Sequence, residues 1–291
     1  MGRIIRPDPS APFPRGEGIG GLRQEAQAYY AEGMEENRLQ RGSGRIEFAR
    51  TREIVSRYLP PPPAIIFDIG GAAGVYALWL ARQGYEVHLI DPIPLHVEQA
   101  RQASAQQPDT PIASCAIGDA RHLDHADASV DDALLFGPLY HLTERNDRIT
   151  ALREAARIVR PGGVVLAVGI SRFVSTLDGL AKGYLTDPVF ARIVQDDLAS
   201  GQHRNPTNDP AYFTTTFFHH PTELKGEVEE AGLVHERTIG IEGPAWLAAR
   251  VQEEWDDPNR RAEMLTALRW IEEEPSLLGA SQHLIVVARK A

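Results

Sequence analysis

A glycine-rich loop between a short apolar run and a helical pattern carries the residues best suited to bind a ligand. Phe67-Asp68-Ile69 leads into Gly70-Gly71-Ala72-Ala73-Gly74. Glycines at such a turn let the backbone bend tightly and let a ligand approach it closely. A second signal is Asp91, 17 residues after Gly74, whose carboxylate can accept both hydroxyls of a ribose. The pattern predicts a nucleotide-like ligand; the alternative is a tight turn with a surface aspartate.

The acid before the glycines narrows the choice of ligand. The stretch lacks the lysine of a P-loop, which disfavours a site that grips phosphates. A dinucleotide-binding fold remains an alternative. Asp68, however, stands two positions before Gly70, and a carboxylate there is poorly suited to a pyrophosphate. It suits a ligand that carries a positively charged amino group.

Strand and helix patterns alternate around this loop, which predicts an α/β protein with a parallel, doubly wound sheet covered on both faces. The predicted strands are 64–69, 86–90, 112–117, 130–136, 164–170, 234–241 and 282–290. The predicted helices are 22–40, 46–59, 74–83, 95–105, one that includes 149–159, 221–231 and most of 244–274. The proline run 60–63 ends the second helix before the first strand.

Four segments follow from these patterns. Residues 1–59 are predicted to form an N-terminal arm and helical lid, and 60–170 a cofactor-binding core. Residues 171–220 interrupt the alternation and are rich in aromatic side chains, and 221–291 complete the core sheet. We expect the insertion at 171–220 to cover an apolar substrate. The alternative is a helical subdomain with a small core of its own, or a dimer contact.

Four sequence blocks together resemble the class I S-adenosylmethionine-dependent methyltransferases that act on small molecules. The blocks are Asp68 to Gly74, Leu89-Ile90-Asp91-Pro92, Ile117-Gly118-Asp119-Ala120 and Ala155 to Gly163. The resemblance covers 64–170 well and 221–291 loosely. It implies a Rossmann-like, seven-stranded, mostly parallel sheet whose last strand, 282–290, runs in reverse. Ala72 departs from the family pattern, which often has glycine there.

The resemblance also implies roles toward S-adenosylmethionine, whose product is S-adenosylhomocysteine. Asp68 would act on the methionine amino group, directly or through water. Asp91, followed by Pro92, would bind the ribose hydroxyls, and Asp119 would accept a hydrogen bond from the adenine amine. Other matching residues would border the cofactor: Gly70, Gly71 and Gly74 beside methionine and ribose, Ala120 beside the adenine, and Phe136 and Gly137 beside the transferable methyl group.

The segment after the fourth predicted strand offers candidate catalytic residues. Methyl transfer is an in-line displacement, and a base is needed only where the acceptor must lose a proton. Residues 136–142 leave the carboxyl end of that strand, where open α/β sheets bind ligands. We expect Tyr140 and His141 to contact substrate, with His141 as the base at an ordinary pKa of ~6.5. The alternative is that His141 packs the start of a helix.

Aromatic and basic residues outside the core are candidates for substrate binding. Tyr29 and Tyr30 lie on the first predicted helix, and Arg172, Phe217 and His219 lie in the insertion. Arg38 or Arg50 could pair with an acid of cofactor or substrate, although paired charges on a solvated helix face are favoured. The acids and histidines of 122–132 are irregularly spaced, so we expect a solvated loop and no metal.

Composition restricts the function further. The 291 residues carry a formal net charge of −10, which disfavours nucleic acid as a partner. No run approaches the ~18 apolar residues of a membrane span. The single cysteine, Cys115, fits a cytoplasmic protein and is expected in the core. The sequence predicts a methyltransferase for a small molecule, with an oxygen, nitrogen or carbon acceptor, as monomer or homodimer. Alternatives are a protein or peptide methyltransferase, a non-catalytic cofactor-binding protein and a nicotinamide-dependent oxidoreductase.

Overall fold

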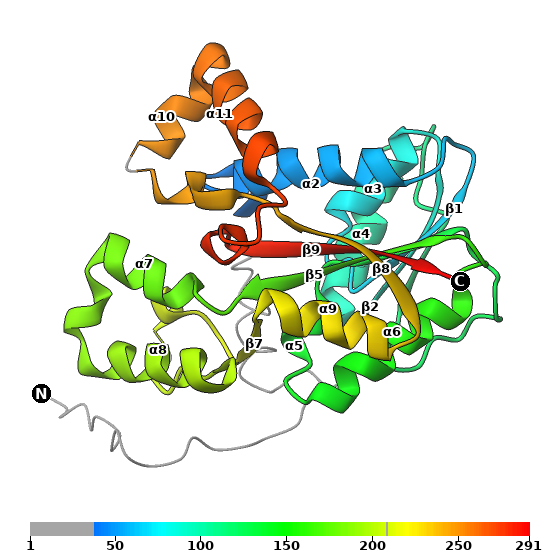
Figure 1. The fold of residues 1–291 in the computed structure, drawn as a ribbon. Coiled ribbons are helices and arrows are strands. Elements are labelled where there is room, and N and C mark those ends of the chain that lie inside the picture. Colours follow the sequence, from blue (N-terminus) through cyan, green and yellow to red (C-terminus); the bar gives the residue numbers. More distant parts are fainter. Residues whose placement is uncertain (1–37, 208, 249) are drawn as a thin grey trace, which may run out of the picture.

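The computed structural model describes residues 38–291 except 208 and 249, and these form one mixed sheet between layers of helices (Figure 1). Tyr29, Tyr30 and nearly all of the first predicted helix lie outside the described residues. The strands are β1 (Ile65–Ile69), β2 (Glu86–Asp91), β3 (Ser114–Ile117), β4 (Asp132–Leu135), β5 (Val164–Ser171), β6 (Gln202–His203), β7 (Thr216–His219), β8 (Leu233–Gly240) and β9 (His283–Lys290). Each strand predicted from the sequence matches one of them.

Helices separate most strands that follow one another in the chain, as the alternating pattern predicts, although β4 follows β3 without one. The α-helices are α2 (Gly44–Tyr58), α3 (Val75–Arg82), α4 (Pro94–Ala105), α5 (Pro138–His141), α6 (Arg145–Ile158), α7 (Val174–Lys182), α8 (Pro188–Ser200), α9 (Pro221–Glu230), α10 (Val251–Asp256) and α11 (Pro258–Ile271). The 3₁₀ helices are η2 (Arg38–Gln40), η3 (Tyr184–Thr186), η4 (Pro210–Tyr212), η5 (Gly243–Leu247) and η6 (Leu278–Ala280). No helix in the described part of the chain is both long and apolar enough to cross a membrane.

The sheet is mostly parallel, but it has nine strands in the described residues rather than the seven expected. The main path runs β3-β2-β1-β4-β5, and β9 then pairs with β5 and with β8. The pairing of β9 with β5 is antiparallel from Val164↔Arg289 to Ile170↔His283, which confirms the reversed last strand. The two additional strands are short: β7 pairs with the end of β5, and β6 pairs with β7.

Two apolar clusters fix the helices to the two faces of the sheet. On one face α2, α3 and α4 bury residues such as Ile54, Leu80 and Ala100 against the strands. On the other face α6 and α9 bury residues such as Leu152 and Leu224 (Figure 1). Burial of aliphatic side chains contributes roughly 1.5–3 kcal/mol each, so this packing holds the helices on the sheet. The carboxyl ends of β1, β2 and β4, which carry the glycine loop and the acids, lie side by side.

The insertion forms a subdomain with its own small core. Tyr184, Phe190 and Tyr212 pack ring against ring, with centroids 4.8–5.6 Å apart. Asp197 adds buried polar contacts within the insertion: it accepts from the Ser175 hydroxyl at 2.6 Å and lies 3.0 Å from the His203 ring. This arrangement matches the alternative interpretation of 171–220 better than a lid.

Strand β3 is an edge strand, which changes the expected place of the cysteine. It pairs with β2 alone, and its side chains are largely exposed. Cys115 is half-buried there rather than part of the core. The sequence pattern could not show this, because an apolar run does not reveal whether a strand has neighbours on both sides.

Candidate active site

A cavity of about 620 Å³ lies at the carboxyl ends of β1, β2 and β4. Its volume falls within the ~300–1,000 Å³ of typical small-molecule pockets. The cavity brings together all the described residues that the sequence predicts for cofactor and catalysis, except Gly74 and Asp119. They are Asp68, Gly70, Gly71, Asp91, Pro92, Ala120, Phe136, Gly137, Tyr140 and His141.

Backbone contacts hold the glycine loop against the end of β2. The amides of Gly70 and Gly71 donate to the carbonyl of Ile90 at 2.8 and 3.2 Å. Gly70 has a φ of +72°, and a Cβ there would lie 2.7 Å from the ring of Pro138. Ala72 has a φ of +47°, a left-handed conformation that costs a non-glycine residue roughly 1–2 kcal/mol. The glycine usual at this position in the family would remove that strain.

Replacing Gly70 with alanine is expected to lower the free energy of unfolding by more than the roughly 1–2 kcal/mol of a left-handed backbone alone, because the new Cβ also meets Pro138. Gly162 is the matched control, since its φ is +83° and a Cβ there meets no atom within 4 Å. Urea denaturation of Gly70→Ala and Gly162→Ala measures both losses. Equal losses would show that Pro138 yields without cost.

Asp68 is a buried carboxylate that faces the cavity. It is 1% exposed, and neither of its oxygens has a hydrogen-bond partner among the described residues. Burial, with the nearby charge of Asp91, raises its pKa from 3.8 to about 7. A Cβ at Gly71 would lie 2.6 Å from Asp68 Oδ2, so the glycine leaves that oxygen open. A buried charge of this kind requires a cationic partner.

Asp91 is fixed at the end of β2 by three contacts. It accepts hydrogen bonds from the amides of Ile93 at 2.9 Å and Ala72 at 3.0 Å. The ring of His96, which also lines the cavity, lies 3.0 Å from Asp91 Oδ1. The carboxylate is thus oriented before any ligand binds. His96 was missed from the sequence, because its position on α4 relative to Asp91 follows from the turn between them.

Two residues predicted to touch the cofactor lie outside the cavity lining. Asp119 is paired with Arg121 at 2.8 Å, and Arg121 also binds Asp147 at 2.9 Å. Burial opposes ionisation of Asp119, but Arg121 outweighs it and lowers the pKa of that carboxyl. Gly74, with a φ of +82°, begins α3 and packs near the side chain of Ala100, so its observed role is in the turn.

Tyr140 and His141 line the cavity on the short helix α5. The hydroxyl of Tyr140 donates to the carbonyl of Phe136 at 2.7 Å, and its ring lies edge-on to His141 at 4.7 Å. Burial lowers the pKa of His141 from 6.5 to about 4. The expectation of an ordinary pKa is therefore wrong: the ring is neutral near pH 7 but only weakly basic. Its catalytic role stays a prediction.

The structure corrects the predicted substrate contacts in the insertion, because Arg172, Phe217 and His219 do not line this cavity. Arg172 donates to the carbonyl of Phe218 at 2.9 Å and pairs with Glu223. His219 is fully buried and lies 3.3 Å from Glu227. The aromatic composition suggested a pocket wall. Because β7 joins the sheet at the end of β5, these side chains pack under α9 instead.

Helices η2 and α2 form part of the cavity wall, although from this region the sequence suggests only Arg38 and Arg50 as ligand contacts. Phe48, Tyr76 and Phe136 form an aromatic surface of the cavity. The ring centroid of Tyr76 lies 5.7 Å from that of Phe48 and 5.2 Å from that of Phe136. Arg38 lines the cavity too, paired with Glu47. Arg50 instead is fully buried and pairs with Glu53 and Glu272, so neither arginine fits the picture of solvated helix charges.

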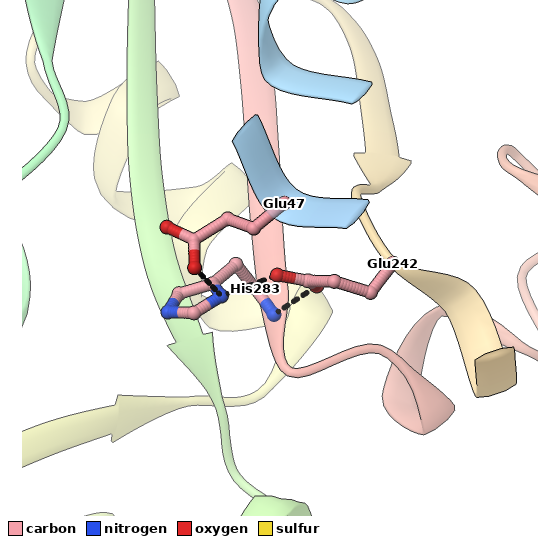
Figure 2. Close-up of side chains that lie close together, drawn as sticks. All are labelled: Glu47, Glu242 and His283. Carbon is pink, nitrogen blue, oxygen red and sulfur yellow. Dashed lines mark hydrogen bonds and ion pairs between the residues drawn. The ribbon is translucent and has the colours of Figure 1, made fainter. Parts of the chain in front are cut away.

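One charged corner of the cavity escaped sequence analysis entirely. Glu47 from α2, Glu242 after β8 and His283 at the start of β9 meet there (Figure 2). Atoms of the three side chains lie within 4.8 Å of one another. They are far apart in the chain: the pairing of β9 with β8 brings His283 to Glu242, and helix α2 supplies Glu47. No spacing in the sequence signals such a cluster.

Comparisons with known proteins agree with this fold. Residues 67–167 match a family model described as a methyltransferase domain. The ubiquinone/menaquinone biosynthesis C-methyltransferase UbiE of Caulobacter vibrioides is 30% identical over 139 residues, which are 45% of this chain and 53% of that protein. Methyltransferase GfsG of Streptomyces halstedii is 32% identical over 117 residues, 40% of this chain and 41% of that protein. The matches span about half the length of these relatives.

Solved structures show the same fold. An S-adenosylmethionine-dependent methyltransferase from Methanosarcina mazei aligns with 81% of this chain and 96% of its own, at 20% identity and a TM-score of 0.52. One from Mesorhizobium loti aligns with 84% of this chain and 99% of its own, at 17% identity and a TM-score of 0.54. Residues 67–167 thus carry a methyltransferase domain, the fold is that of S-adenosylmethionine-dependent methyltransferases, and S-adenosylmethionine is the cofactor that such a domain implies.

Proposed function

We propose that this chain transfers the methyl group of S-adenosylmethionine to a small organic acceptor. The observation that carries the proposal is Asp68, a buried carboxylate that faces the cavity next to Asp91 and has no hydrogen-bond partner in the part of the chain that the structure describes. The methionine ammonium group of the cofactor supplies the cation that Asp68 lacks. A dinucleotide would bring a pyrophosphate to the same place, and two buried carboxylates would repel it.

The residues of the chain fit this cofactor. Asp68 would hold the ammonium group, and Asp91 would accept a ribose hydroxyl on Oδ2, which has one present contact while Oδ1 has two. Bound S-adenosylmethionine supplies an electrophilic methyl group on its sulfonium. Phe136 and Gly137 border the cavity between the glycine loop and Tyr140, so they would limit where an acceptor can sit. Alignment of acceptor and methyl group is worth up to ~7–11 kcal/mol in such reactions.

A small acceptor fits the cavity better than a polypeptide or a nucleic acid. The walls beyond the cofactor loops are largely aromatic or aliphatic, with Phe48, Tyr76, Val168 and Ile241 among them. The net charge of −10 disfavours nucleic acid. The names of UbiE and GfsG are those of methyltransferases, and that of UbiE places it in quinone biosynthesis. Because the chain has a single cysteine, we infer that the enzyme is cytoplasmic. Its oligomeric state is a separate question, and analytical ultracentrifugation would distinguish a homodimer from a monomer.

Calorimetric titration tests the proposed function. We expect S-adenosylhomocysteine to bind the full chain with micromolar affinity, and we expect no heat from NADH at the same concentrations. Binding of NADH with the higher affinity would favour an oxidoreductase. A folded protein that binds neither compound would contradict the assignment of the cavity.

Replacing Asp91 with asparagine is expected to weaken S-adenosylhomocysteine binding about 10- to 100-fold. The change removes a charged acceptor, and hydrogen bonds to charged groups are worth about 1.5–3 kcal/mol. Asp109→Asn is the matched control, because Asp109 is an exposed acid outside the cavity lining. The same titration measures both variants. Unchanged affinity in Asp91→Asn would remove Asp91 from the cofactor site.

A further inference from the structure

We propose that His283, oriented by Glu242, is the base that removes the proton from a hydroxyl group of the methyl acceptor. The acceptor is then a ring-containing molecule with an acidic hydroxyl, methylated on oxygen. This inference rests on the proposed function and names the acceptor class and the base for it. Three observations carry it: the fixed orientation of the ring, the charges around it and the walls beside it.

The orientation of His283 is fixed by a carboxylate that cannot move freely. The ring nitrogen Nδ1 lies 2.6 Å from Glu242 Oε1 (Figure 2). Glu242 is fully buried, and its other oxygen accepts from the backbone amide of His283 at 3.0 Å and from the hydroxyl of Ser281 at 2.9 Å. In the neutral ring Nδ1 therefore keeps its proton and donates a hydrogen bond to Glu242, which leaves Nε2 as the acceptor.

The acceptor nitrogen is available to a ligand. His283 lines the cavity, and its side chain is 14% exposed. Among the described residues, Nε2 makes no hydrogen bond and is not one of the enclosed polar atoms. A carboxylate behind a histidine whose outer nitrogen is open is the arrangement that orients catalytic histidines in general.

The surrounding charges stabilise the protonated ring that a base must become. Burial disfavours the imidazolium, but Glu47, 3.8 Å from Nδ1, and Glu242 outweigh this effect and raise the pKa of His283 above 6.5. The positive charge of Arg38, which is paired with Glu47, lowers the pKa of His283, but its effect is smaller than that of the two carboxylates. At His141 burial dominates instead, and its pKa of about 4 makes it the poorer base. His283 is thus matched better to proton removal near neutral pH.

The charged groups of this corner also compensate one another without a metal ion. Arg38 pairs with Glu47 through both guanidinium nitrogens, and Nδ1 of His283 is already bonded to Glu242. A divalent cation would have to displace both partners. The two carboxylates instead balance Arg38 and the imidazolium that forms on proton transfer.

The cavity wall next to this corner suits an aromatic ring. The rings of Phe48 and Tyr76 pack against each other there at an interplanar angle of 46°, and Val168 and Ile241 are aliphatic residues of the same lining. In the proposed step the hydroxyl O–H bond breaks and an N–H bond forms at Nε2. The oxyanion then bonds to the methyl carbon as the carbon–sulfur bond breaks, which releases neutral S-adenosylhomocysteine. The proton leaves His283 for solvent, so atoms and charges balance.

The test uses the full chain with S-adenosylmethionine and a panel of hydroxybenzoates, dihydroxybenzenes and naphthols. We expect O-methylated product from at least one of them, identified by mass. For that acceptor, His283→Gln should lower kcat by about 100-fold or more, the usual worth of a general base. For its nitro-substituted derivative, already ionised at the assay pH, the loss should nearly vanish. Glu242→Gln should move the rising limb of the kcat profile to lower pH.

Controls separate the possible failures. His235→Gln alters a histidine on β8 that bonds to Thr238 and does not line the cavity. The rates of methylation of the acceptor and of its nitro-substituted derivative should therefore both stay at the wild-type level. Equal losses on both acceptors in His283→Gln would overturn the base assignment, as would activity that EDTA abolishes and a divalent cation restores. No turnover of any hydroxylated acceptor by protein that binds S-adenosylhomocysteine would overturn the acceptor class alone. Failure to bind S-adenosylhomocysteine would contradict the proposed function itself.

Discussion

Replacing Asp68 with asparagine is expected to stabilise the cofactor-free protein and to weaken its binding of S-adenosylhomocysteine. The native carboxylate is 1% exposed and neither oxygen has a hydrogen-bond partner within residues 38–291 as described, so its ionised form opposes folding at neutral pH. Its pKa is about 7 in the fold against a reference value of 3.8. This pKa difference corresponds to a destabilisation of about 4 kcal/mol by the ionised carboxylate at neutral pH. Burial of the asparagine amide also costs free energy, so we expect Asp68→Asn to raise the free energy of unfolding by about 1–3 kcal/mol.

The sign of the pH dependence follows from the raised pKa. Between pH 4 and 7 the folded protein holds the Asp68 proton more tightly than the unfolded chain does, so stability falls as the pH rises. Above about pH 7 the penalty is fully present. The stability difference between Asp68→Asn and the wild type should therefore grow from pH 4 to 7 and then become constant.

Cofactor affinity should respond in the opposite sense. The methionine ammonium group binds the ionised carboxylate, so the affinity of the wild type for S-adenosylhomocysteine should fall as the pH drops below about 7, by up to about tenfold per pH unit. Asp68→Asn should bind about 10- to 100-fold more weakly at pH 8, with a flatter pH profile.

Urea denaturation and calorimetric titration across pH 5–8 measure these effects, and Asp109→Asn serves again as the exposed control. A variant that is both less stable and equally good at binding would show that Asp68 already has a partner in the fold.

Replacing Arg148 with methionine is expected to lower the free energy of unfolding by about 3–5 kcal/mol, the usual loss when one partner of a buried ion pair is removed. Arg148 is 2% exposed and binds both oxygens of Glu227, the closest at 2.6 Å. It also donates to the carbonyls of Leu142 at 2.9 Å and Thr143 at 3.0 Å. Its loss would leave the charge of Glu227 buried beside His219 alone.

A matched control lies on the same two helices. Arg145 of α6 pairs with Glu230 of α9 at 2.6 Å, but both side chains are about half exposed. Arg145→Met should leave the denaturation midpoint nearly unchanged, because exposed ion pairs contribute little. The double variant Arg148→Met/Glu227→Leu should recover most of the loss of Arg148→Met, since it removes the stranded charge. A similar loss in both single variants would show that burial of the Arg148 pair is of no consequence.

The Arg148 pair also bears on the cavity. Leu142 and Thr143 directly follow α5, the helix that carries Tyr140 and His141. Their carbonyls are held by Arg148, whose guanidinium carbon lies 3.5 Å from the centroid of the Phe217 ring. Phe217 was expected to contact substrate. Its observed contact suggests that it supports the active-site helix from behind instead.

The cofactor half of the site could be predicted from local sequence. A buried strand, a glycine turn and a helix follow one another within residues 65–82, so their geometry is determined by neighbours in the chain. The positive φ of Gly70 and the open side of Gly71 next to Asp68 agree with the tight turn expected there. Asp91 ends the adjacent parallel strand, and parallel strands in register necessarily bring such ends together.

The acceptor half could not be predicted, because its residues meet only through long-range pairing. His283 reaches the cavity since β9 inserts antiparallel between β5 and β8, and that register sets it beside Glu242 and Glu47. The aromatic residues of the insertion misled the prediction for the same reason: β7 joins the sheet edge and turns them into a local core. Likewise the pKa values of Asp68 and His141 depend on burial, which no composition reveals.

The sequence by itself determined the alternation of strands and helices, the glycine loop and its two acids, because each depends on residues close together in the chain. Three properties could be learned only from the three-dimensional structure: which histidine has carboxylate partners, which aromatic residues form the cavity wall and which charges are buried. They depend on how close the sheet brings distant segments of the chain, and on which side chains their packing removes from water.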